Sequence, residues 1–396
     1  MAETNFLDLA KLSRPWCKSQ KVDALLSIVA LSQIVLSAIQ GVLVAIRVSE
    51  EIASVYRVYL SAITILIAIP FLLKRKPVLV IVTYLVVLAI YFFHTVFFPS
   101  TVQFWKYEAF RFTLPICIPI VLCVVSIKDK SIFFYCLKFI AYITGFFSLI
   151  YGATAFLGSY TLGANYDYNQ GYGYMLLFPI IVLFYQKKRY SLLFSGILFV
   201  LLLLYGGRGP LLAILLFFAF VLLKQKRFVL IGILVALYFV GIPILASTAK
   251  SLGISSRMLE LIATGEMGQD NGRDVIGEEI EIGIQQNPYG WGLFGDRVIT
   301  HGANYAHNFI LEILAEFGLY IGILVLVIFG FEIIRSFIKL KGGDQDMFTL
   351  FLCACFVPML FSGSYLTSTN FALFIGIMLL LPKYYKKRGV PKLKRI

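Results

Sequence analysis

The sequence FVLIGILVALYFVGIPILAST, residues 228–248, contains no charged side chain. A helix needs about 20 apolar residues to cross the hydrocarbon core of a bilayer, because each residue advances the helix by about 1.5 Å. This segment is long enough to do so, and its apolar residues are not confined to one face as in a surface helix. It therefore predicts a membrane-spanning helix.

Similar apolar segments fill most of the chain. Hydrophobic residues make up 60% of the 396 residues and charged residues only 14%, whereas soluble domains carry about 25% charged residues. Each segment must be helical, because hydrocarbon offers the backbone no hydrogen-bond partner. We predict an all-α, polytopic integral membrane helical bundle that forms a single membrane domain, residues 1–396, with about 12 transmembrane helices. The predicted spans are 22–46, 56–73, 77–97, 112–127, 131–157, 173–186, 191–206, 210–223, 228–248, 309–331, 347–362 and 369–383.

Basic residues gather at every second connection between these spans, as in Lys74-Arg75-Lys76 and Lys187-Lys188-Arg189. The alternate connections are nearly free of such clusters. Because basic loops stay in the cytoplasm, both termini are predicted to be cytoplasmic. The net charge of +14 follows from this topology and suits contact with anionic membrane lipids, so no nucleic-acid partner is expected.

The longest outer connection, residues 249–308 before the tenth span, holds a periodic signal of its own. Ile276, Ile280 and Ile284 recur at every fourth position, with acidic residues between them. This spacing predicts a short amphipathic helix on the membrane surface, ended by the proline that follows. Because loops of this length are usually functional or disordered, we expect this large extracytoplasmic loop to form part of the active site.

Three polar side chains on the predicted outer side stand where a helix begins. Arg208 precedes one span, Arg273 opens the amphipathic helix, and His307 precedes the tenth span. The free N–H groups and partial positive charge of a helix N-terminus favour phosphate, and arginine adds a fork of donors. Histidine exchanges a proton near neutral pH. The three groups therefore suggest a phosphate site with an acid–base residue.

Simpler roles stay open for these residues. An arginine near the end of a span is often an interfacial anchor, and a loop histidine is often structural. His301 also competes with His307 for the acid–base role. Asn308 and Glu312 are candidates for supporting residues, since intramembrane carboxylates are functional hypotheses by default, but Glu312 is near enough to the interface to be polar lining.

The predicted outer loop 158–174 is rich in tyrosine. Tyr166, Tyr168 and Tyr172 stand among amide and carboxylate side chains, a combination that suits the binding of sugar rings. The same tyrosines fit the aromatic belt that marks a membrane interface. Both interpretations stay open.

No outer group of acidic, histidine or cysteine side chains has the spacing of metal ligands, so no metal site and no cofactor is predicted. The pair Asp344 and Asp346 falls on the predicted cytoplasmic side after two glycines. We interpret this pair as a solvated turn.

The motifs resemble the O-antigen polymerase and O-antigen ligase superfamily, which includes the Wzy-type polymerases of capsule and exopolysaccharide pathways. The resemblance covers mainly Tyr205 to Val325, and elsewhere it rests on hydropathy. The residues that carry it are Gly207-Arg208-Gly209, Gly272-Arg273, Pro288-Tyr289-Gly290-Trp291-Gly292 and Ala306-His307-Asn308, followed by an apolar helix with Glu312 and Gly318.

This resemblance implies a C-type glycosyltransferase (GT-C) fold in a bacterial cytoplasmic (inner) membrane, with an active site that faces outward. The substrates would be glycans linked to undecaprenyl pyrophosphate. The arginines that match Arg208 and Arg273 would hold the pyrophosphate, and the histidine that matches His307 would act as base on the acceptor hydroxyl. The family implies an inverting reaction without a metal.

We therefore expect a polysaccharide polymerase that joins undecaprenyl-pyrophosphate-linked oligosaccharide repeat units at the outer leaflet, for a capsule, an exopolysaccharide or an O-antigen. A chain-length regulator and a flippase are the expected protein partners. One alternative is a ligase that moves the finished glycan to another acceptor. Another is a flippase or transporter of lipid-linked oligosaccharides, which the lack of an evident internal repeat disfavours.

Overall fold

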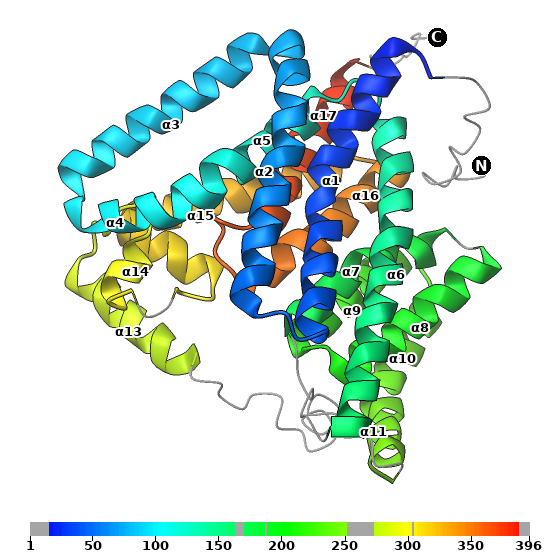
Figure 1. Ribbon diagram of the computed structural model, residues 1–396. Coiled ribbons are helices and arrows are strands. Elements are labelled where there is room, and N and C mark those ends of the chain that lie inside the picture. The colour runs from blue at the N-terminus through cyan, green and yellow to red at the C-terminus, as the bar shows by residue number, and fades with distance from the viewer. Residues whose placement is uncertain (1–15, 163–169, 187, 252–272, 303–304, 388–396) are drawn as a thin grey trace, which may run out of the picture.

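The computed structural model describes residues 16–162, 170–186, 188–251, 273–302 and 305–387. Within these ranges every regular element is a helix and no strand is present. The helices form one bundle in which segments far apart in the sequence lie side by side (Figure 1). The predicted all-α helical class is confirmed.

Each of the twelve predicted apolar segments falls on one helix or on consecutive helical segments. Seven helices are long and apolar enough to cross a membrane, and three shorter apolar helices accompany them among the described residues. The chain is thus a multi-pass helical membrane protein, while the number of spans and their sidedness stay predictions. The elements are α1 (Lys18–Ala45), α2 (Glu50–Arg75), α3 (Pro77–Phe97), η1 (Pro99–Thr101), α4 (Val102–Phe104), η2 (Trp105–Cys117), α5 (Ile118–Ser126), α6 (Lys130–Leu162), α7 (Gln170–Tyr185), α8 (Arg189–Tyr205), α9 (Arg208–Lys224), α10 (Phe228–Ala236), η3 (Leu237–Gly241), α11 (Ile242–Ser251), α13 (Arg273–Gln286), α14 (Gly295–Ile299), α15 (Phe309–Lys339), α16 (Gly343–Phe351), η4 (Leu352–Phe356), η5 (Val357–Leu360) and α17 (Thr369–Lys387).

The core lies where α1 packs against α2, α5 and α6, and where α7 packs against α8 and α9. Helix α3 stands away from this core (Figure 1), and His94 is its one buried residue. Its exposed apolar side chains suit contact with lipid, because lipid tails are as apolar as they are. The Nε2 atom of His94 accepts the N–H of Leu293 at 2.9 Å, which ties the far end of α3 to the segment that precedes α14.

Helix α15 is broken at Gly318, where φ is +75° and ψ is 174°. The sequence predicts a continuous span over 309–331, and that prediction is wrong at this point. The conformation at Gly318 is one that residues with a Cβ atom rarely adopt. A Cβ atom here would lie 2.4 Å from the carbonyl oxygen of Pro288, so glycine is required both by the backbone angle and by the close approach of a second chain segment.

The turn Pro288–Gly292 supplies the hydrogen bonds that the broken helix lacks. The N–H groups of Trp291 and Gly292 donate to the carbonyls of Ala315 and Glu316 at 2.9 and 3.0 Å. In return, the carbonyl of Pro288 accepts the N–H that follows the break, at 2.8 Å. A helix can be interrupted within a membrane protein only where protein groups replace its lost bonds. The glycine-rich turn and the break are therefore one structural unit.

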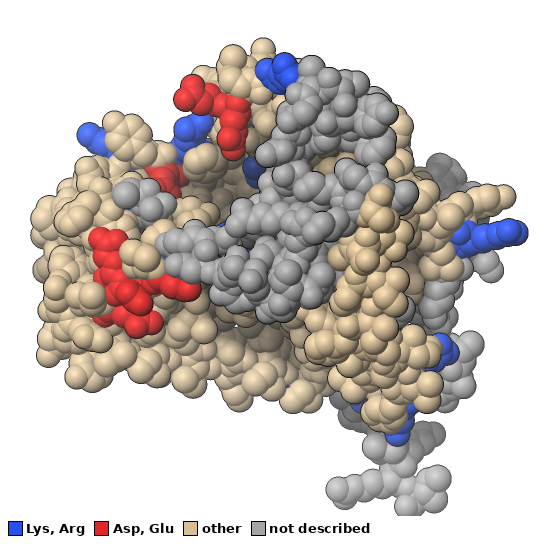
Figure 2. All heavy atoms as spheres, turned by 90° about the horizontal axis from the view of Figure 1, so that it is seen from below, with Lys and Arg blue, Asp and Glu red and all other residues tan. Residues whose placement is uncertain are grey.

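Helix α13 spans Arg273–Gln286 in the described part of the chain, so the predicted amphipathic segment is helical. The side chains of Ile280 and Ile284 do not face lipid. They are buried together with Ala306 and with Ala315 of α15. The intervening acidic side chains of α13 are exposed. Seen from below, red acidic side chains gather in groups on a surface that is otherwise mostly uncharged (Figure 2).

At the end of the bundle predicted to be cytoplasmic, α16 is held by ion pairs. Asp344 pairs with Lys130 of α6, and Asp346 pairs with Lys224 of α9 at 2.6 Å. The hydroxyl of Tyr185 also donates to Asp346. The interpretation of these two aspartates as a solvated turn is wrong, because both carboxylates bridge α16 to other helices.

Gly318→Ala should lower the stability of the folded protein by about 1–3 kcal/mol or more, because the added Cβ atom forces strain on the backbone and displaces the turn. Gly330→Ala is the matched control in the same helix, since a Cβ atom there meets nothing within 4 Å. Thermal unfolding of the purified proteins in detergent measures both. Equal melting temperatures for the two variants would contradict this account of the break.

Candidate active site

The short helix α14 places two adjacent charged residues inside the protein. Asp296 is 0% exposed and Arg297 is 4% exposed. Phe294 precedes them in the left-handed conformation, with φ at +65°. Its buried ring lies 4.9 Å from the guanidinium carbon of Arg297, a distance suited to cation–π attraction. The local turn thus directs both charges into the interior.

Arg297 connects carboxylates from three elements. Its Nε and Nη2 atoms donate to the two oxygens of Glu108, in η2, at 2.6 and 2.7 Å. Its Nη1 atom lies 2.8 Å from Asp296 Oδ1 and 3.6 Å from Glu312 Oε1. Burial by itself would lower the pKa of Arg297, but the carboxylates of Asp296 and Glu108 raise it above its ordinary value. The guanidinium is therefore a fixed cation.

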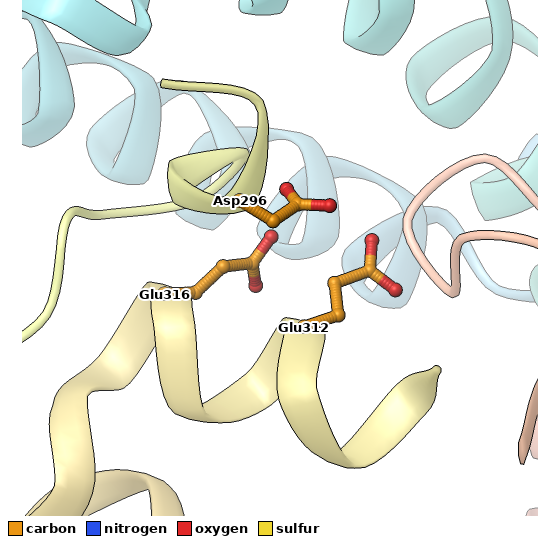
Figure 3. A group of neighbouring side chains, drawn as sticks. All are labelled: Asp296, Glu312 and Glu316. Carbon is orange, nitrogen blue, oxygen red and sulfur yellow. The ribbon is translucent and has the colours of Figure 1, made fainter. Parts of the chain in front are cut away.

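Asp296, Glu312 and Glu316 point toward one another from α14 and from successive turns of α15 (Figure 3). Carboxylate oxygens of the three side chains lie within 4.8 Å of one another, and all three are buried. Such a group could hold a metal ion by distance alone, although the spacing of these residues in the sequence gives no metal-ligand signal.

Protein donors already occupy these carboxylates. Asp296 accepts from Arg297 and, at 2.9 Å, from the N–H of Ala306. Glu312 accepts from the Ser364 hydroxyl and from the N–H of Tyr365 at 3.0 Å. Glu316 accepts from the N–H of Phe294 at 2.8 Å and from the Tyr365 hydroxyl. The cluster therefore fastens the segments at Phe294 and at 364–365 to α15 and the segment at Ala306 to α14, and Arg297 supplies its positive charge.

His307 lies directly after the segment that Asp296 holds. Its φ is +51°, a left-handed conformation that is uncommon for residues other than glycine. The imidazole ring stacks on Tyr305, with centroids 3.9 Å apart, and its Nδ1 atom is buried without a hydrogen-bond partner among the described residues. Burial, Arg273 and Arg297 lower the pKa of His307 against the opposing effect of Asp296. The imidazole is therefore neutral at pH 7 and able to accept a proton.

Two candidate supporting residues have defined structural partners. Asn308 is the N-cap of α15, because its side-chain oxygen accepts the N–H groups of Ile310 and Leu311 at 2.8 and 3.4 Å. Glu312 is a member of the buried carboxylate cluster, 1% exposed, rather than a lining residue at the interface. Both residues hold the first turn of α15 beside His307.

Arg273 shares the site with His307. Its Nη1 atom donates to the carbonyl of Phe361 at 2.8 Å. Its positive charge adds to the effect of burial in lowering the pKa of His307. At Tyr305, burial raises the pKa and Arg273 opposes that rise. Arg273 of α13 thus contacts the loop that follows η5.

Arg208 begins α9, with Gly207 as the N-cap. Helix α9 runs beside α16, η4 and η5, and Lys224 at its far end contacts Asp346 near the start of α16. The two segments therefore run in opposite directions, so the Arg208 end of α9 lies toward η5. The carbonyl that Arg273 contacts, that of Phe361, directly follows η5.

Tyr172 does not belong to this group of side chains. Tyr172 is 2% exposed, stacks on Tyr151 at 4.2 Å and donates its hydroxyl to the carbonyl of Ser148. Its side chain belongs to the core between α6 and α7, and glycan binding by Tyr172 stays a prediction. His301 is exposed. Tyr166 and Tyr168 lie outside the described residues.

Arg297 and most of its partners belong to no motif that marks them in the sequence. The adjacent opposite charges of Asp296 and Arg297 gave a weak local signal in an otherwise apolar segment. Glu108 stands just ahead of a predicted span, as an acidic residue among aromatic ones. Nothing in the sequence pairs Glu108 with Arg297, which is 189 positions further on.

The fold and this buried polar cluster define a multi-pass helical membrane protein with a site at the end of a broken helix. Residues 193–327 match the family model described as O-antigen ligase. This match confirms the resemblance to the O-antigen ligase and polymerase superfamily, and its segment includes Arg208, Arg273, Arg297 and His307. Neither the curated proteins nor the solved structures provide a match to the chain.

Arg297→Met should destabilise the protein by about 3–5 kcal/mol, because it leaves buried carboxylates without their cation. Arg335→Met removes an arginine from an exposed pair with Glu332, whose side chains are 47% and 40% exposed, and should cost about 1 kcal/mol or less. The measurement follows the unfolding of each purified variant and of the wild type as the concentration of denaturing detergent is raised. If both variants unfold with the wild type, Arg297 does not stabilise the cluster.

Proposed function

We propose that this protein is a glycosyltransferase that joins undecaprenyl-pyrophosphate-linked repeat units into a polysaccharide at the outer leaflet of a bacterial cytoplasmic membrane. The observation that carries the proposal is the position of a neutral, partly buried His307 beside Arg273, inside the segment that matches the O-antigen ligase family. An imidazole and a guanidinium in one site suit a reaction that removes a proton and releases a phosphate.

In the proposed reaction, His307 removes the proton from an acceptor hydroxyl. The hydroxyl oxygen attacks the anomeric carbon of the donor, and the bond between that carbon and the pyrophosphate oxygen breaks. Arg208 and Arg273, each at a helix N-terminus, stabilise the charge that develops on the pyrophosphate. A single displacement of this kind inverts the anomeric centre. General base catalysis of this type contributes about 10²–10⁴-fold in rate.

We further propose that the reaction needs no metal. The three clustered carboxylates already accept protein donors, and Arg297 supplies the cation among them. The arginines at the helix N-termini take the place that a divalent cation has at a pyrophosphate. A ligase is the second candidate function, because the matched family model carries that description.

His307→Ala should reduce glycan transfer by at least about 10²-fold, because it removes the base and leaves the arginines in place. His301→Ala is the matched control and should keep wild-type transfer, since that side chain is exposed and has no place in the proposed reaction. Transfer is measured with purified protein and lipid-linked repeat units in excess chelator. Dependence on added magnesium or manganese would contradict the metal-free reaction.

The glycans that accumulate in cells carrying His307→Ala distinguish the candidate functions from one another. A polymerase variant leaves single repeat units and no long chains, whereas a ligase variant leaves long chains on the carrier lipid. A flippase variant leaves repeat units on the cytoplasmic leaflet. Chains of wild-type length in this strain would rule out the catalytic role of His307.

The transfer rate should fall at acid pH with a midpoint below 6.5, the ordinary pKa of an imidazole. The neutral ring is the active form, and burial together with Arg273 favours that form, so activity is lost only as the pH drops through the lowered pKa. Arg273→Gln removes one positive neighbour and should move the midpoint to higher pH as well as weaken transfer. Arg47→Gln, an exposed change elsewhere, should leave the midpoint unchanged. An identical midpoint in His307→Gln would assign the titration to another group.

A further inference from the structure

A polar cavity of about 290 Å³ lies beside Tyr305, the ring on which His307 stacks. The reaction proposed above assigns it no role. The cavity is lined by Arg57, Arg297 and Glu108, and by serine, threonine and asparagine residues of the segment 364–370. Its size is near the lower end of small-molecule sites, which is roughly 300 Å³. It suits a small, hydroxyl-rich group rather than a lipid tail.

A deeper compartment of about 140 Å³ adjoins this cavity, because Arg57, Thr367 and Thr369 line both. Gln33 of α1 lines the deeper compartment and is 1% exposed. Its Oε1 atom accepts the Ser61 hydroxyl at 2.8 Å, but its Nε2 atom has no partner among the described residues. A buried amide donor without an acceptor is destabilising, so this atom indicates a site for a ligand oxygen.

Arg57 lines the cavity and forms no ion pair with a carboxylate of the described residues. It lies within α2, a helix long and apolar enough to span the membrane, where charged side chains are functional hypotheses by default. Its Nη1 atom donates to Gln40 at 3.2 Å, and no carboxylate of the described residues forms an ion pair with it. Arg297, by contrast, is paired with Glu108 and Asp296.

We propose that this cavity binds an acidic sugar unit of the acceptor glycan, with the sugar carboxylate on Arg57 and Gln33 Nε2. The inference rests on the proposed function, since it supplies the acceptor for His307. A guanidinium matches the two oxygens of a carboxylate. Hydroxyl and amide side chains suit the sugar hydroxyls, and Tyr305 connects the cavity to the stacked ring of His307.

The cavity suits a carboxylate better than the donor pyrophosphate. Glu108 stands in its wall, and a fixed carboxylate repels a multiply charged pyrophosphate more strongly than a single carboxylate. Arg273 contacts the carbonyl of Phe361 and is not among the residues that line the cavity. The donor pyrophosphate would thus contact Arg273, whereas the acceptor sugar would contact Arg57.

Direct binding to the purified full-length protein in detergent tests the proposal. The probes are D-glucuronate, D-glucose and inorganic pyrophosphate, measured by ligand-observed NMR. The wild type should prefer glucuronate to glucose, and Arg57→Gln should weaken glucuronate about tenfold or more while glucose changes little, because one charge-assisted contact is lost. Gln33→Leu should weaken glucuronate severalfold. Arg47→Gln removes an exposed positive charge from the preceding loop and should leave all three affinities unchanged.

Two results would overturn the proposal. One is equal glucuronate affinity in the wild type, Arg57→Gln and Gln33→Leu. The other is loss of pyrophosphate binding in Arg57→Gln with glucuronate binding intact, which would place the donor in this cavity. Because binding is measured without transfer, His307→Ala should keep the wild-type preference for glucuronate. Failure of the proposed reaction and failure of this site are therefore distinguishable.

Discussion

The structure of the site depends on the buried guanidinium of Arg297. It joins Glu108 of η2, Asp296 of α14 and Glu312 of α15, and Glu108 precedes Arg297 by 189 positions. A buried cation without these carboxylates, or the carboxylates without the cation, would be strongly unfavourable. Since Asp296 in turn accepts the N–H of Ala306, this single charge also determines where the residue before His307 lies.

A second constraint is the break of α15 at Gly318. The half-helix before the break carries the buried carboxylates Glu312 and Glu316 on successive turns (Figure 3). The glycine-rich turn before α14 replaces the missing helical donors, because its N–H groups donate to the carbonyls of Ala315 and Glu316. The same turn leads directly into α14, so the backbone bonds at the break and the ion pairs of Arg297 hold the same two elements together from both sides.

The matched segment 193–327 contains the proposed base and the proposed pyrophosphate arginines, but it does not contain the whole site. Glu108 and Arg57 come from the amino-terminal third of the chain, and Tyr365 comes from the loop before α17. This division has a physical meaning in our proposal: the matched segment carries the transfer chemistry, and the flanking helices shape the side from which the acceptor glycan arrives. Differences among related proteins in acceptor preference would then arise in α1 and α2.

The sequence by itself determined the features that depend on neighbouring residues: apolar segments that must be helical, the amphipathic helix α13, and the place of His307 beside the N-cap of α15. Length, apolar content and helix caps are local, so a few adjacent residues suffice to predict them. Only the tertiary structure decided that Tyr172 is buried in the core, that Gly318 breaks a helix, and that Arg297 meets Glu108. These depend on which helices pack together, and an ion pair across 189 positions leaves no mark in either local sequence. The cavity at Arg57 was also decided by the tertiary structure, because the role of a charged residue in an apolar helix depends on the groups that surround it.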